Sequence, residues 1–198
     1  PVAAASFEYE VCYKCHADNN AGQAFLPRAI PQTNVRFEFD PQNPSFHPIE
    51  APGRSQDVPS LKPPYTTASI IACTDCHQSD TSPDAGGSGA AGPHGSRFRP
   101  LLLARYDTQE YVSESPSAYA LCYRCHSRTS LLENDSFDAH KKHIDGEDAS
   151  CAACHDGHGI SASQGTNLNN SHLINFDISY VMPGSNGKLE FIDDGVRK

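Results

Sequence analysis

The sequence has no tryptophan and a single methionine, and only 37% of its 198 residues are hydrophobic. This is little apolar material for a core of that length, although the chain lacks the extreme composition of a disordered protein. The longest aliphatic cluster is Leu101-Leu102-Leu103, far shorter than the roughly 20 residues of a membrane-spanning helix. We therefore expect no membrane span, and a core supplied by something other than aliphatic side chains.

Basic residues are scarce as well. The chain has 15 Lys and Arg against 24 Asp and Glu, which gives a net charge of -9. An acidic chain does not neutralise phosphates, so binding to nucleic acid is disfavoured, and no basic amphipathic stretch indicates a membrane surface. No charged segment followed by an apolar one opens the chain, which is the pattern expected of a mature form.

Cysteine and histidine are abundant, and they follow one pattern. All eight Cys fall in four Cys-x-x-Cys-His frames. Zinc sites and redox disulfides also use Cys-x-x-Cys, but neither requires a His directly after the second Cys, whereas attachment of c-type haem does. The four frames, which predict four haem sites, are Cys12-Tyr-Lys-Cys15-His16, Cys73-Thr-Asp-Cys76-His77, Cys122-Tyr-Arg-Cys125-His126 and Cys151-Ala-Ala-Cys154-His155.

The spacing within a frame has a chemical reason. The two thiols form thioethers with the two vinyl groups on one edge of the porphyrin, and the next residue is an axial ligand of the iron. We therefore predict four covalently bound c-type haems, with the proximal iron ligands His16, His77, His126 and His155. This attachment takes place outside the cytoplasm, so an extracellular or outer-surface location is expected, with the periplasm as the alternative. We expect no catalytic residue, and no enzyme.

Histidines outside the frames are candidates for the second axial position of each iron. There are six of them, His47, His94, His140, His143, His158 and His172, against one Met, Met182, in a turn-like stretch. Four bis-His haems are the simplest interpretation, because Met ligation would serve one haem at most. Since His158 follows His155 by three residues, it cannot reach the opposite face of the same haem and would have to serve another.

An internal repeat ranks these candidates. The first and third frames resemble each other, and each is followed by Ser-Phe and a His, then by another frame, then by His-Gly. This register predicts a single tetrahaem unit, 1–198, and indicates two tandem di-haem halves at about 1–110 and 111–198. It selects His47, His94, His143 and His158 as distal ligands. His140 competes with His143, three residues away on the same helix face, and His172 remains a further candidate.

The predicted fold class is mostly irregular coil with short α-helices and a few short strands around a core of stacked haems. Short helices are expected at 69–72, 98–106, 117–121 and 136–143. Alternating apolar residues predict strands at 35–39 and 174–180, and a hairpin is expected across the turn at 183–187. The charged residues Arg36, Glu38 and Asp40 are interpreted as a solvated face.

Some motifs indicate a family. Phe46-His47-Pro48, Gly92-Pro93-His94-Gly95, Cys154-His155-Asp-Gly-His158-Gly159 and His172-Leu173-Ile174-Asn175 are similar to segments of the extracellular multihaem cytochrome filaments, or cytochrome nanowires, of metal-reducing bacteria. The resemblance implies stacked haems in one continuous chain, a homopolymer of head-to-tail copies, and transfer of electrons to redox partner cytochromes and extracellular acceptors. The apolar head Val2–Phe7 and the tail Lys188–Ile192 are the expected contact segments.

Three hypotheses for the function follow. The first is long-range electron transfer through four closely packed bis-His haems, as the subunit of such a filament. The second is a soluble periplasmic tetrahaem shuttle. The third, a multihaem reductase, needs an iron with an open position, and the surplus of histidines argues against it.

Overall fold

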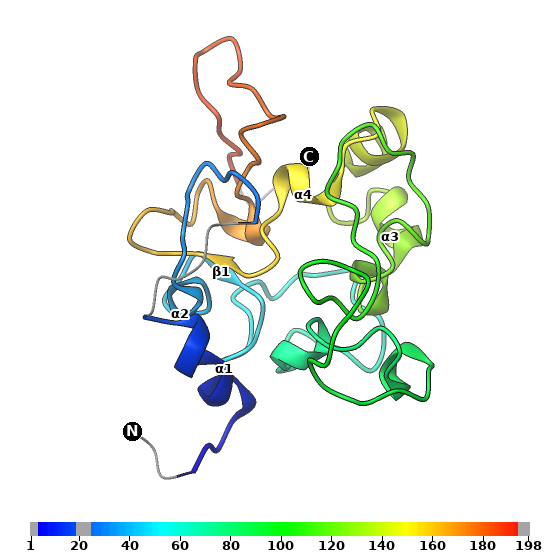
Figure 1. Cartoon of the computed structure of the whole chain (residues 1–198). Helices are drawn as coiled ribbons and strands as arrows, with labels where there is room; N and C mark the ends of the chain where they lie inside the picture. The colour runs from blue at the N-terminus through cyan, green and yellow to red at the C-terminus, as the bar shows by residue number, and fades with distance from the viewer. Residues whose placement is uncertain (1–3, 19–24, 194–198) are drawn as a thin grey trace. The chain divides into compact units, whose positions relative to one another are not determined.

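The computed structural model describes residues 4–18 and 25–193. Contacts divide the chain into two compact units. Unit 1 comprises Pro1–Asp57, Thr67–Ile70 and Ala152–Val196, and unit 2 comprises Val58–Thr66, Ile71–Cys151 and Arg197–Lys198. In Figure 1 the blue N-terminal segments and the orange to red C-terminal segments belong to unit 1, and the green middle of the chain belongs to unit 2. Unit 1 thus combines segments from both halves of the sequence repeat.

Regular elements are short, and turns and irregular backbone make up most of the described residues. Among these residues no helix is both long enough and apolar enough to cross a membrane. The helices are α1 (Glu8–His16), α2 (Val35–Glu38), α3 (Arg128–Leu132) and α4 (Cys151–Cys154); the 3₁₀ turns are η1 (Cys73–Asp75), η2 (Pro83–Ala85), η3 (Cys122–Arg124) and η5 (Ser171–Leu173); η4 (Lys142–Gly146) is a π-helical turn; the strands are β1 (Ser45–Phe46) and β2 (Gly159–Ile160).

A small antiparallel pair organises unit 1. Strand β1 pairs with β2, with Ser45 opposite Ile160 and Phe46 opposite Gly159. Phe46 and Ile160 are buried together with Phe39. Gly159 is required here, because a Cβ atom on it would lie 2.1 Å from the Glu38 carbonyl oxygen. The close approach fixes helix α2 against β2.

The strand expected at 35–39 is wrong, since these residues form helix α2 and its C-terminal cap. The Asn34 side chain accepts a hydrogen bond from the Arg36 N–H and begins the helix, as N-cap residues do. The expected solvated face is also incorrect at Glu38, which is only 7% exposed. Helix α2 turns this carboxylate inward, toward the histidines described below.

Other expected elements are replaced by turns. Residues 69–72 are extended, and 117–121 form turns in which the Ser115 hydroxyl accepts from the Ala118 N–H. At 98–106 a tight turn brings Leu102 back to Phe98, with Leu101 at a φ of 65°. At 136–143 the expected helix is present in part, because residues 140–141 are helical and continue into the π-helical turn η4. At 174–180 only isolated bridges form, Arg28 with Asp177 and His155 with Ile174. The 183–187 turn is present, but no strands flank it. At 98–106, 117–121 and 174–180 backbone groups bond to segments distant in the sequence.

The hydrophobic cluster of unit 2 is small. Ala118, Tyr119 and Ile144 are buried at its centre, and Tyr106, Tyr123, Leu132 and Cys151 pack around them. A cysteine of a haem frame therefore forms part of this cluster.

Candidate haem sites

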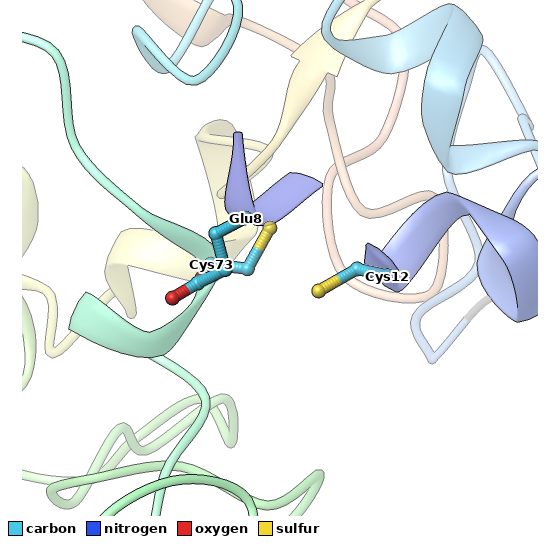
Figure 2. Close-up of side chains that lie close together, drawn as sticks. All are labelled: Glu8, Cys12 and Cys73. Carbon is cyan, nitrogen blue, oxygen red and sulfur yellow. The ribbon is translucent and has the colours of Figure 1, made fainter. Parts of the chain in front are cut away.

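Each of the four frames lies on a short helical element. The first frame occupies the end of α1, the second begins at η1, the third at η3, and the fourth is helix α4 followed by His155. Figure 2 shows the Cys12 side chain on α1 and the Cys73 side chain on η1. One helical turn within each frame places both thiols on the same side of the backbone, as attachment to one porphyrin edge requires.

None of the eight cysteines forms a disulfide. In unit 2 the thiols of different frames approach one another. Cys151 forms a hydrogen bond with Cys122, and this bond lowers the pKa of the Cys122 thiol. Burial raises the pKa of Cys76 to about 12, with further contributions from nearby Cys122 and Cys125. Unit 2 therefore gathers thiols from the second, third and fourth frames.

Three proximal histidines have their ring Nδ1 atom held by a neutral oxygen. The partners are the Pro100 carbonyl for His77 at 3.2 Å, the Ser60 hydroxyl for His126 at 2.9 Å, and the His172 carbonyl for His155 at 2.9 Å. Metal-binding histidines are usually oriented in this way, and the bond leaves Nε2 for the metal. This arrangement links residues far apart in the sequence and could not be read from the frames.

The fourth frame is clamped by a buried arginine. The Arg28 guanidinium donates hydrogen bonds to the carbonyls of Ala152 at 2.6 Å, Asn175 at 2.8 Å and His155 at 2.9 Å. It also lies 3.6 Å from the Asp156 carboxylate, with 9% and 14% of the two side chains exposed. Arg28 thus holds the end of helix α4 next to the proximal ligand. Sequence reasoning missed Arg28, because no local pattern marks it.

A segment from 172 to 177 forms the other side of this clamp. Besides the His172 carbonyl on His155, the Asn175 N–H donates to the Cys154 carbonyl at 2.8 Å, and the Asp177 N–H to the Ala153 carbonyl at 2.9 Å. The Asn175 side chain also bonds both backbone groups of Ile30. We infer that this segment positions the fourth frame.

Two predicted distal ligands, His47 and His158, lie opposite each other in unit 1. His47 follows β1 and His158 precedes β2, so the two face each other one position beyond the Phe46–Gly159 pair. The His47 N–H donates to the His158 carbonyl at 2.8 Å. The His47 Nδ1 atom meets the Gly157 carbonyl at 2.6 Å. Burial lowers the pKa of His47. The structure therefore brings together one candidate from each half of the sequence repeat.

The His158 ring has a charged partner. Its Nδ1 atom lies 2.8 Å from a carboxylate oxygen of Glu38, and its ring packs against Phe39 at 5.1 Å between centroids. Burial raises the pKa of Glu38, and the bond to His158 only partly offsets this. Burial lowers the pKa of His158, but the Glu38 bond and charge outweigh it, so the net change is upward.

The remaining histidine candidates differ in their surroundings. His94 is exposed between Gly92 at a φ of 87° and Gly95 at 116°. His140 and His143 both pack on the Phe137 ring, and His140 also has its Nδ1 atom 3.3 Å from the Ser136 hydroxyl. His172 directs Nε2, the nitrogen that a haem ligand would use, toward Asp193 at 3.4 Å. Met182 is 75% exposed.

The residues fit covalent haem at these positions. The cysteines form no disulfide, three of the four proximal histidines have Nδ1 engaged, and His47 and His158 show the same ring orientation. Such a donor set leaves Nε2 of each ring for iron and both thiols of each frame for the porphyrin. The distal assignments remain predictions.

Comparison with known families gives one match. A family model described as outer membrane cytochrome MtrC/MtrF-like, domains II/IV, matches residues 2–167. No curated protein and no solved structure matches the chain. The matched range includes all four frames and ends before His172.

Proposed function

The chain belongs to the family of outer membrane cytochromes described as MtrC/MtrF-like, domains II/IV, and from this premise we propose that it conducts electrons through four bis-His c-type haems to acceptors outside the cell. The observation that carries the proposal is the set of four complete frames whose cysteines form no disulfide, together with three frame histidines whose Nδ1 atom is fixed by a neutral oxygen. When bound, each haem supplies one reversible Fe(III)/Fe(II) couple.

The residues of the chain set the conditions for this transfer. The proximal ligands are His16, His77, His126 and His155, and the distal ligands are His47, His94, His143 and His158. Two imidazole ligands would leave each iron no open site for a small substrate, which favours electron transfer over a reductase. The net charge of -9 favours the ferric state of each centre and so a low potential.

Haem content and spin state test this proposal. The full chain, produced with its haems by an exporting host, is expected to contain four haems by the pyridine haemochrome assay and by intact mass. Its ferric spectrum should be low-spin only, because every iron has two imidazole ligands. Binding of carbon monoxide to the reduced protein, or a high-spin component, would indicate an open position and favour the reductase hypothesis.

The finer proposal is that copies of the chain form an extracellular filament. It rests on the likeness of the His47, His94, His158 and His172 motifs to the tetrahaem filament cytochrome OmcE. The tail Lys188–Ile192 lies in the described structure without strand pairing, and residues 2 and 3 of the head Val2–Phe7 lie outside the described residues. A filament requires a head-to-tail interface that never closes. Negative-stain microscopy of native material decides this point, and discrete particles alone would favour the soluble shuttle.

A further inference from the structure

Glu38 distinguishes His158 from four other candidate iron ligands. His47, His77, His126 and His155 each place Nδ1 against a neutral carbonyl or hydroxyl oxygen. His158 places it 2.8 Å from a carboxylate. This carboxylate is 9% exposed and the His158 side chain 36%, so solvent screens the pair less than it screens a surface pair.

The position of Glu38 is built by several contacts. The Asn43 side chain, itself buried, donates to the Glu38 carbonyl at 2.8 Å and accepts from the Ala162 N–H at 2.8 Å, which ties the end of α2 to the segment after β2. Gly159 lets the Glu38 backbone approach β2 directly. The His158 N–H is fixed by the Asp156 carboxylate at 3.1 Å. Both partners of the bond are therefore anchored by their own backbone.

An imidazole becomes a stronger donor to its metal when the ring nitrogen that does not bind the metal is hydrogen-bonded to a carboxylate. A stronger donor and a nearby negative charge both stabilise the ferric over the ferrous state. We propose that Glu38 is a positioning residue which orients His158 and gives the haem that it ligates a lower potential than the haem ligated by His47. This inference rests on the proposed function, because it takes both histidines as axial ligands.

The consequence is a direction for one step of the electron path. His47 and His158 are neighbours across the strand pair, so the two haems that they hold would be neighbours in the path. With the lower potential at the His158 centre, one electron would pass downhill from that centre, which would be oxidised, to the His47 centre, which would be reduced. Reducing equivalents would therefore collect on the His47 side of this pair.

Glu38→Gln tests the proposal, because glutamine keeps the shape and one acceptor oxygen but removes the charge. In a spectroelectrochemical titration of the full holoprotein, we expect one of four midpoint potentials to rise. The expected rise of this midpoint potential is about 59 mV, which corresponds to a tenfold change in the one-electron equilibrium constant. The other three potentials should stay within the error of the titration.

Glu50→Gln is the matched control. It removes the same charge from unit 1, but the Glu50 carboxylate bonds the Tyr13 hydroxyl at 2.8 Å and not a histidine ring. Equal shifts of the potential in the two variants would mean that net charge alone causes the effect, and this would overturn the proposal. An unchanged set of four potentials in Glu38→Gln would overturn it as well.

Two further measurements separate the possible failures. Haem content and low-spin signature are recorded for the wild type first, and their loss would refute the proposed function and not only the role of Glu38. If Glu38→Gln fails to bind four haems, electron paramagnetic resonance of the wild type takes its place. One ferric component with a narrower spread of g values than the others is expected from the stronger donor, and the absence of such a component overturns the proposal.

Discussion

Arg28→Met is expected to destabilise unit 1 by about 3 to 5 kcal/mol. The side chain donates to three carbonyls of the fourth frame region and pairs with the half-buried Asp156. Methionine fills much of the volume but leaves those carbonyls without their donor and the Asp156 charge without its partner. Urea unfolding of the holoprotein, followed by far-ultraviolet circular dichroism and by the Soret band, should show a lower midpoint with an unchanged slope.

Arg36→Met provides the control for this loss. Arg36 pairs with Asp18 at 2.8 Å, but the two side chains are 48% and 70% exposed. Exposed ion pairs contribute about 0 to 1 kcal/mol, so this variant should unfold close to the wild-type midpoint. Equal midpoints for the two variants would mean that the Arg28 clamp does not stabilise the folded state.

The haem frames could be predicted from the sequence because their chemistry is local. Five consecutive residues hold both thiols and one imidazole, so spacing alone specifies the site. The partners of the rings are not local. The Nδ1 atom of His126 meets Ser60, and that of His47 meets Gly157. No periodicity links such residues, so only the folded chain shows which histidines are already oriented for a metal.

His172 illustrates the same limit. A histidine in a motif that resembles a haem protein is a reasonable ligand candidate from sequence. In the structure it contributes its backbone carbonyl to His155, while its ring turns toward Asp193. Such a residue can act through its backbone carbonyl. The position of that carbonyl depends on the path of the main chain, which the residue type does not predict well.

Helix α2 shows how a local signal can be outweighed. The alternation of Val35, Phe37 and Phe39 fits a strand, but Asn34 is a good N-cap and Asn43 satisfies the carbonyls at the end of the turn. With a helix, Glu38 moves to the inner face. The interpretation of Arg36, Glu38 and Asp40 as one solvated face depended on the strand, and it failed at Glu38 for that reason.

His158→Ala is expected to have the largest spectroscopic effect. Removal of the imidazole opens one axial position, so one of four haems should change from low spin to high spin and bind carbon monoxide when reduced. His47→Ala should do the same to a different haem, and the double variant should convert two of the four. The absorption and electron paramagnetic resonance spectra of the ferric proteins measure these fractions.

His172→Ala is the matched control, because it removes the same side chain from unit 1 while leaving the carbonyl that holds His155. Its spectrum should remain low-spin throughout. If His172→Ala showed high-spin iron and His158→Ala had an unchanged spectrum, the distal ligand would be His172 and not His158. If His47→Ala and the double variant both converted the same single haem, the two histidines would serve one iron, and the cross-strand pair would not connect two neighbouring centres.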